Sequence, residues 1–270
     1  IRSQLVQVHL TVKDGSNHVS GLSLSDFDLL EDGVPREINR LDSGAMPLQV
    51  ALLFDTSESM RGALRQIQEA ATYFVESLQP GDRITLVTFN SDIRSIVQAD
   101  DDFKPILDGI HQAQPRGITK LYDALLFAMK HLSDREGRKA IVLFTDGEDT
   151  AYGSSLDVAL RAAAFYGYPI YTLSAGEGLK NQALRNVLRR LADVNGARMF
   201  LVQNPTDLRP AFLAISGELR STYVLNYYTA APRDGRWHAL DVKVRDPRLK
   251  VRARKGFFAR SGGSQTERIR

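Results

Sequence analysis

One carboxylate and two hydroxyl groups occupy alternate positions of the segment Asp55-Thr56-Ser57-Glu58-Ser59. These oxygen atoms, with no cysteine or histidine nearby, are ligands that suit a hard cation such as Mg²⁺. The alternative is structural, because Ser57 or Ser59 would also serve as the cap of a following helix. The position of this segment in the fold therefore decides between a metal site and a helix cap.

The segment follows an apolar run at 48–54 and precedes an amphipathic pattern at 60–78. The apolar run is typical of a buried parallel strand, and the pattern after it predicts a helix. Asp55 and the two serines then lie at the carboxyl edge of an open sheet, which is where α/β folds of this kind bind ligands.

Two further loops are expected at the same edge of the sheet. Thr145-Asp146-Gly147 ends a second buried strand, and Thr119 begins the helix expected at 120–132. Each has a structural alternative, since Thr119 would suit a helix cap and residues 145–147 a plain turn. Together the loops predict a metal site with these candidate ligands: Asp55, Ser57, Ser59, Thr119 and Asp146.

Strand and helix patterns alternate through the middle of the chain. Strands are expected at 48–54, 83–89, 139–145, 169–175 and 198–203, and an antiparallel edge strand near 93–98. Helices are expected at 60–78, 102–112, 120–132, 155–166, 181–194 and 206–219. This alternation predicts an α/β fold, a doubly wound and mostly parallel sheet covered on both faces.

Both ends of the chain are rich in β-strand patterns instead. At the N-terminal end we expect a strand at 5–12 and a hairpin whose strands are 27–31 and 36–41. At the C-terminal end we expect three strands, at 222–229, 238–245 and 250–259. Neither end is large enough to bury a good core alone, which predicts one small β-sandwich built from both ends, with the α/β domain inserted in it. The predicted division is 1–45, 46–220 and 221–260, followed by a flexible polar tail at 261–270.

The composition of the chain argues against several classes of protein. The net charge is only +3, from 35 basic and 32 acidic residues, which argues against a dedicated nucleic-acid binder. No apolar stretch reaches the ~20 residues of a membrane span, and no glycine-rich nucleotide loop is present. The absence of cysteine excludes disulfides and thiolate metal sites. The first residue is Ile1 rather than methionine, which indicates a processed or trimmed product.

The strand expected at 250–259 carries Lys250, Arg252 and Arg254 in alternation with Val251 and Ala253. This alternation places the cations on one face of the strand and the small apolar residues on the other. A solvated outer face is the default interpretation. Contact with an anionic polysaccharide or phospholipid is the alternative.

The middle of the chain, roughly residues 46–220, resembles a von Willebrand factor A-type domain. Asp55, Ser57 and Ser59 match the first motif of the family's metal-ion-dependent adhesion site, Thr119 its central threonine, and Thr145-Asp146-Gly147 its acidic loop. The resemblance implies a bound Mg²⁺, with Mn²⁺ or Ca²⁺ as alternatives. It also implies a protein partner that offers a Glu or Asp carboxylate to an open position on the ion.

A second resemblance concerns the ends of the chain. The stretch from Leu22 to Gly33, and the basic strand that leads to Phe257 and Phe258, are similar to segments of bacterial extracytoplasmic proteins related to the von Willebrand factor A family. This resemblance implies an extracytoplasmic or secreted location.

Three functions follow as hypotheses. The first is a metal-dependent, non-catalytic protein-binding module of the adhesion type. The second is a structural or scaffolding protein in which the metal only stabilises the fold. The third is a metallohydrolase, which needs a general base beside the ion. Glu148 and Asp149 are candidates for that base. These two residues and Asp123 also suit a supporting role, as carboxylates that surround the site without binding the ion. Intracellular relatives that work beside AAA-type ATPases are a further alternative.

Overall fold

The computed structural model describes residues 4–43, 46–97, 102–145, 148–174 and 181–259. The predicted tail at 261–270 and the candidate ligand Asp146 therefore lie outside the described residues. Within the described part of the chain, none of the helices combines the length and the apolar character needed to cross a bilayer.

The central sheet has the strand order β11-β10-β9-β6-β7-β8. Its parallel strands are β6 (Leu48–Asp55), β7 (Arg83–Phe89), β9 (Arg138–Thr145), β10 (Ile170–Ser174) and β11 (Met199–Leu201). The edge strand β8 (Ile93–Val97) is antiparallel to β7. The predicted mostly parallel α/β sheet is confirmed.

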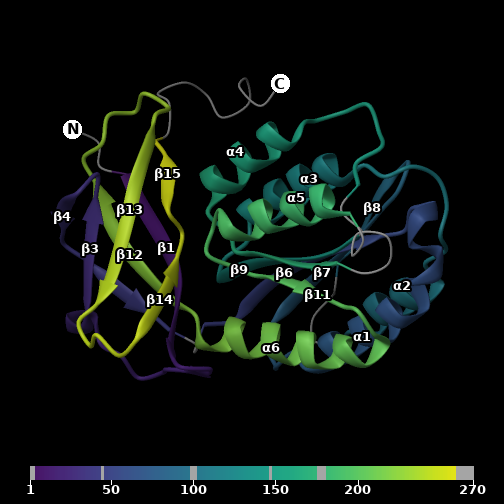
Figure 1. The fold of residues 1–270 in the computed structure, drawn as a ribbon, viewed down its shortest axis with the longest axis horizontal. Coiled ribbons are helices and arrows are strands. Elements are labelled where there is room, and N and C mark those ends of the chain that lie inside the picture. The colour runs from purple at the N-terminus through teal and green to yellow at the C-terminus, as the bar shows by residue number, and fades with distance from the viewer. Residues whose placement is uncertain (1–3, 44–45, 98–101, 146–147, 175–180, 260–270) are drawn as a thin grey trace.

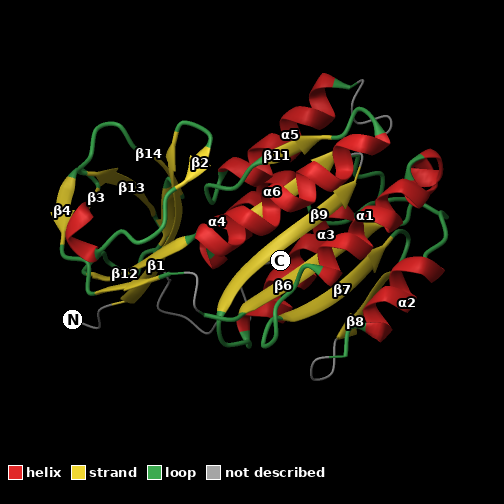
Figure 2. Ribbon diagram, turned by 90° about the horizontal axis from the view of Figure 1, so that it is seen from below, coloured by secondary structure: helices red, strands yellow, loops and turns green. Residues whose placement is uncertain are grey.

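Helices cover both faces of this sheet (Figures 1 and 2). One face packs against α1 (Leu64–Glu76), α2 (Lys104–Gln112) and α6 (Leu208–Ser221). The other face packs against α3 (Leu121–Ser133), α4 (Leu156–Tyr166) and α5 (Gln182–Asp193). Successive side chains of β6 alternate between the two cores, because neighbouring residues of a strand point to opposite faces. This explains why the strand is an unbroken apolar run.

Two more sheets combine strands from both ends of the chain. One has the order β14-β1-β12-β5 with β2 paired to β1, and the other has the order β15-β13-β3-β4. Their bounds are β1 (Gln4–Asp14), β2 (Asn17–His18), β3 (Phe27–Glu31), β4 (Val34–Arg36), β5 (Arg40–Asp42), β12 (Tyr223–Thr229), β13 (Trp237–Val244), β14 (Lys250–Ala253) and β15 (Gly256–Phe258). Apolar residues of both sheets form a third core cluster.

Two strand predictions at the ends of the chain were wrong. The second strand of the first hairpin is β4 rather than residues 36–41, and β5 pairs with β12 in the other sheet. The strand predicted at 250–259 is split into β14 and β15, which belong to different sheets. Arg254 lies at this break and is only 4% exposed, so it does not share the predicted solvated face.

Arg254 is held by backbone carbonyl groups. Its guanidinium donates to the oxygens of Gly256 at 3.0 Å, Gln7 at 2.9 Å and Ala164 at 2.5 Å. Ala164 belongs to the last turn of α4, whose carbonyl groups lack helical partners and attract a cation. Arg254 therefore ties the terminal sheets to the α/β unit.

Helix α6 forms a second link between the α/β unit and the terminal sheets, because β12 begins almost directly after it. The buried Arg138 donates to the carbonyl oxygens of Leu219 at 2.9 Å and Thr222 at 3.1 Å. Asp82 accepts hydrogen bonds from Arg220 and, at 2.9 Å, from the amide of Leu48. The C-terminal end of α6 is thus fixed to the base of the central sheet.

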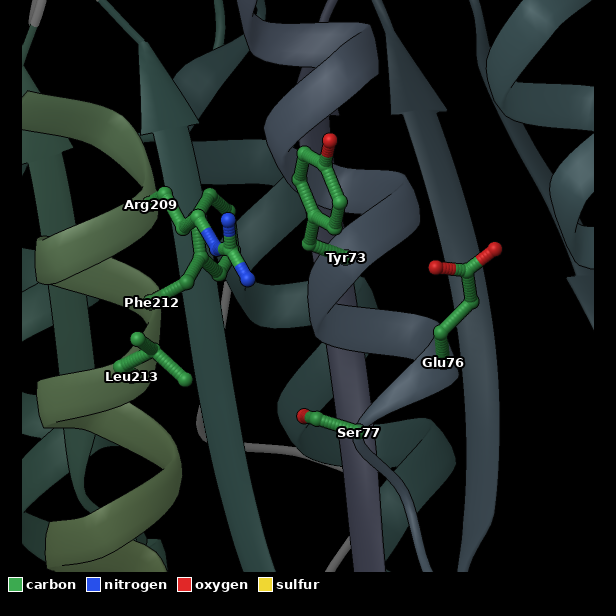
Figure 3. Close-up of a pocket in the computed structure, with 6 residues that line it drawn as sticks. All are labelled: Tyr73, Glu76, Ser77, Arg209, Phe212 and Leu213. Carbon is green, nitrogen blue, oxygen red and sulfur yellow. The ribbon is translucent and has the colours of Figure 1, made fainter. Parts of the chain in front are cut away.

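The N-terminal half of α6 packs beside α1, with a shallow pocket of about 190 Å³ between them (Figure 3). The guanidinium of Arg209 lies over the ring of Tyr73 at 5.2 Å from its centre. Below them the buried Phe212 stacks on Phe144 of β9 at 5.0 Å between ring centres. Of the predicted metal ligands, those within the described residues do not line this pocket.

Candidate functional site

Asp55 ends β6 and is 1% exposed. Its Oδ1 accepts the amide hydrogen of Ser57 at 2.9 Å, and its Oδ2 accepts the hydroxyl hydrogen of Thr145 at 2.6 Å. Because β9 lies beside β6, the end of one strand orients the carboxylate at the end of the other. The sequence pattern did not predict this role of Thr145; its only signal was a hydroxyl residue at the end of a neighbouring buried strand.

The hydroxyl groups of Ser57 and Ser59 lie 3.1 Å apart. Ser57 precedes the short 3-10 helix η2 (Glu58–Gly62), yet its side chain makes no capping hydrogen bond. The helix-cap alternative is therefore wrong for Ser57. Ser57 is buried and Ser59 is exposed, so the pair forms a hydroxyl face that extends from the interior to solvent.

The loop that carries Thr119 is fastened to the loop after β6. The amide of Arg116 donates to the carbonyl of Thr56 at 2.9 Å, and the amide of Glu58 donates to the carbonyl of Gly117 at 3.1 Å. Gly117 has a φ of +70°, and a Cβ atom there would lie 2.3 Å from the hydroxyl oxygen of Ser91. A side chain at this position would be strained by the positive φ and would displace the Ser91 hydroxyl, which favours glycine here.

Thr119 is 2% exposed. The residue that caps α3 is Lys120, so the helix-cap alternative is wrong for Thr119 as well. The amide of Thr119 donates to the hydroxyl of Thr150 at 2.9 Å, but its own hydroxyl has no hydrogen bond to any residue that the structure describes. The hydroxyl of this largely buried residue is therefore open to a ligand or to water.

The acidic loop after β9 packs against the start of α3. Asp149 accepts the amide hydrogens of Tyr122 at 2.9 Å and Ala151 at 3.1 Å, and burial raises the pKa of its carboxyl group. Asp123 accepts the amide hydrogen of Ser154 at 3.1 Å. Both carboxylates therefore brace loops around the site, and each oxygen of Asp149 already accepts a backbone hydrogen bond. Glu148 is exposed.

The residues at this edge fit a hard cation by the chemistry of their donor atoms. They supply an oriented carboxylate, a pair of adjacent hydroxyl groups and the hydroxyl of Thr119, which has no hydrogen bond to a described residue. All are oxygen donors, as Mg²⁺ requires. The structure brings Asp55, Ser57 and Ser59 together and fastens the loop of Thr119 beside them.

A second group of possible metal ligands, missed by the sequence reasoning, comprises Glu31, Asp32 and His238. The buried Glu31 accepts hydrogen bonds from Tyr227 at 2.9 Å and Thr229 at 2.8 Å. Asp32, with a φ of +51°, begins the turn between β3 and β4, and its Oδ2 lies 2.7 Å from Nδ1 of His238. These contacts fasten the β3–β4 hairpin to β12 and β13, which is a structural role for the Glu-Asp-Gly stretch.

The mainly parallel sheet between two helix layers, with its polar edge, defines an α/β fold of the Rossmann-like class. The family model for the von Willebrand factor type A domain matches residues 49–212, which is more than half of the chain. The chain therefore belongs to the von Willebrand factor type A domain family. No curated protein matches it in a sequence search.

Solved bacterial structures share this fold at low sequence identity. An aerotolerance-related membrane protein from Bacteroides fragilis is 18% identical, with a TM-score of 0.53 over 64% of this chain and 98% of that chain. The von Willebrand factor domain of the type V pili tip protein Mfa5 from Porphyromonas gingivalis is 16% identical, with a TM-score of 0.52 over 63% of this chain and 94% of that chain.

A von Willebrand factor type A protein from Catenulispora acidiphila is 14% identical, with a TM-score of 0.57 over 90% of this chain and 75% of that chain. This match covers more of the chain than residues 49–212 do. The likeness in fold therefore extends into the terminal β strands.

Proposed function

We propose that this protein is a divalent-cation-dependent protein-binding module of the adhesion type. In this proposal Mg²⁺, or alternatively Mn²⁺ or Ca²⁺, is held by Asp55, Ser57, Ser59, Thr119 and Asp146. The observation that carries the proposal is the pair of hydroxyl groups 3.1 Å apart beside the oriented carboxylate of Asp55. Neither the Ser57 nor the Thr119 side chain makes a helix-capping hydrogen bond, so capping does not account for either hydroxyl group.

The proposed ligand set explains how a partner would be recognised. Mg²⁺ takes six oxygen ligands and keeps several waters. In the proposed site the three uncharged hydroxyl groups would bind the ion directly and Asp55 and Asp146 through waters, so its charge would be only partly neutralised. When bound, the ion would attract an anionic oxygen, which a Glu or Asp side chain of a partner would supply. Ser59 is the exposed member of the set, so the partner would approach from its side.

Binding is favoured over catalysis because one of the two candidate general bases, Asp149, is already engaged, which leaves the exposed Glu148 as the other candidate. Both oxygens of Asp149 accept backbone hydrogen bonds, which hold this carboxylate in the wall of the site. The names of two structural neighbours agree with adhesion. One is the pili tip protein of Porphyromonas gingivalis, and the other is a pilus adhesin of Lactobacillus rhamnosus, 10% identical with a TM-score of 0.55.

The domain layout and the location belong to the same proposal. The two terminal sheets would form one β-sandwich from residues 1–45 and 221–260, with the A-type domain at 46–220 inserted in it. Their common apolar cluster and the direct pairing of β1 with β12 support this layout. A surface role of the pilus kind would place the protein outside the cytoplasm.

The test compares Mg²⁺ binding by the chain with that of the Ser59→Ala variant, using calorimetry after removal of metal with EDTA. We expect a loss of affinity of at least tenfold, on the order of what lesser changes around metal sites cost. The variant Ser154→Ala, which lies at the same edge outside the ligand set, should bind as the unaltered chain does. Undiminished affinity in Ser59→Ala would refute the site.

Glutarate, a dicarboxylate that mimics a Glu side chain, separates the remaining hypotheses. The proposed binder should bind Mg²⁺ more tightly in its presence. If Mg²⁺ raises the melting temperature but glutarate has no effect, the ion only stabilises the fold. Turnover of a phosphoester or peptide substrate that requires Mg²⁺ or Mn²⁺ would favour the metallohydrolase.

A further inference from the structure

An open, shallow cleft lies where the terminal sheets meet the α/β unit. It has a volume of about 530 Å³ and is lined by residues of α4, α5, β13 and β15 and of the segments next to them. This volume falls in the ordinary range for small-molecule sites, which often lie between structural units. None of the four proposed metal ligands that the structure describes lines it.

An aromatic platform forms one wall of the cleft. Trp237, the single tryptophan of the sequence, is 42% exposed and contacts Phe258 edge-on at 5.2 Å between ring centres. A Cβ atom at residue 256 would lie 2.2 Å from the indole ring, so Gly256 allows the ring to lie against the strand. The platform is therefore held from below while much of the indole faces solvent.

The wall around the platform carries more cationic than acidic side chains. Of the acidic residues in the wall, Asp157 lies 3.8 Å from Arg190, and Asp193 lies 3.9 Å from Arg252. Arg161 and Lys255 also line the cleft and are exposed, and neither forms an ion pair within the described part of the chain. The cleft thus presents two cations whose charges the protein does not balance.

A third cation lies directly behind the wall. Arg254 is buried and donates to the carbonyl of Ala164, which itself lines the cleft. Its hydrogen bonds go to backbone carbonyl groups, and no carboxylate among the described residues pairs with it. A buried charge neutralised only by dipoles adds positive potential to the nearby surface.

We propose that this cleft binds an anionic saccharide, namely a pyranose unit that carries a carboxylate. The C–H face of the sugar ring would pack on Trp237, which buries apolar surface on both sides. Arg161 and Lys255 would bind the carboxylate through charge-assisted hydrogen bonds. The Asp157 and Asp193 oxygens would accept hydrogen bonds from ring hydroxyl groups.

These two aspartates also distinguish a saccharide from an acidic peptide. An acidic peptide side chain brings these aspartates a carboxylate without hydroxyl donors, whereas each unit of a uronic acid chain combines one carboxylate with several hydroxyl donors. The proposal concerns a site apart from the metal edge, and its ligand binding should persist in EDTA. Failure of this proposal therefore leaves the proposed adhesion function untouched, and the reverse also holds.

The test is a titration of the chain with trigalacturonate in EDTA, followed by the fluorescence of Trp237. We expect a saturable change that weakens as salt is added, because screening reduces charge attraction. The neutral trisaccharide maltotriose should give no saturable change. An equal response to maltotriose, no response to trigalacturonate, or tighter binding of hexaglutamate would each overturn the proposal.

Substitutions in the wall of the cleft test whether the saccharide binds there. Arg161→Gln and Lys255→Gln should each weaken trigalacturonate binding about tenfold, the effect of one charge-assisted hydrogen bond. The matched control is Lys243→Gln, which removes a cation from β13 outside the cleft and should leave the affinity unchanged. Unfolding curves confirm that each variant is folded. Equal affinity in all three variants would contradict the assignment of the cleft.

Discussion

Replacement of Glu218 by alanine is expected to lower the free energy of unfolding by about 3 kcal/mol, the lower end of the cost of breaking a buried ion pair. Glu218 lies on α6 with a side chain that is 2% exposed. Its Oε1 lies 2.6 Å from Arg198 of the α/β unit and 3.3 Å from Lys13 of β1. The alanine variant leaves both cations without this carboxylate.

The two cations keep part of their side chains in water, which is why the lower end of the range applies. The control is Glu69→Ala, which removes an exposed helical glutamate 3.9 Å from Arg65. That variant should change stability by less than about 0.5 kcal/mol. Urea unfolding measures both changes. Similar values for the two variants would show that Glu218 does not join α6 to β1.

The second large effect is a loss of stability in acid caused by His9. This residue of β1 is 6% exposed, and its pKa is lowered from 6.5 to about 3 by burial and by the charges of Arg254, Arg138 and Lys139. Between these two values the unfolded chain binds a proton that the folded chain excludes. The contribution of neutral His9 to the stability of the folded chain is therefore complete above pH 6.5 and is lost as the pH falls towards 3.

Between these two pKa values we expect the free energy of unfolding to fall by about 1.4 kcal/mol for each pH unit of acidification. Urea unfolding at pH 7, 6 and 5 measures it, and the variant His9→Gln should show a flatter dependence than the unaltered chain. His111→Gln provides the control, because His111 is exposed on α2. If His9→Gln and the unaltered chain lose stability in parallel, another group causes the acid sensitivity.

The α/β unit was predictable because its signals are local. Apolar runs such as 48–54 and 139–145 are unambiguous when both faces of a strand are buried. The first hairpin turns at the Asp-Gly pair 32–33, where both residues have the positive φ that a tight hairpin turn requires. The strand predictions at 36–41 and 250–259 failed because the chain moves from one terminal sheet to the other there.

Buried charges were the least predictable feature. Arg254 and Arg138 bind backbone carbonyl groups far away in the sequence, and no side-chain pattern encodes such partners. Alternation on a strand suggested that Arg254 is solvated, but the break between β14 and β15 turns it inward. The cleft around Trp237 escaped prediction for the same reason, because separate elements build its wall.

The candidate metal site was predictable in part. The spacing of Asp55, Ser57 and Ser59 at the end of a strand indicated their proximity, and the structure brings them together. Capping was a reasonable alternative for Ser57 and Thr119, because position alone cannot show where a hydroxyl donates or accepts. The bond from Thr145 to Asp55 depends on strand order in the sheet, which a single sequence does not give directly.

Anomalous diffraction from crystals grown with Mn²⁺ and glutarate would show whether a divalent cation binds at this edge and accepts a carboxylate. We expect an anomalous peak for Mn²⁺ within bonding distance of the hydroxyl oxygens of Ser57 and Ser59, with a carboxylate oxygen of glutarate or of a neighbouring molecule on the same ion. Mn²⁺ bound elsewhere, with no peak beside these serines, would contradict this expectation.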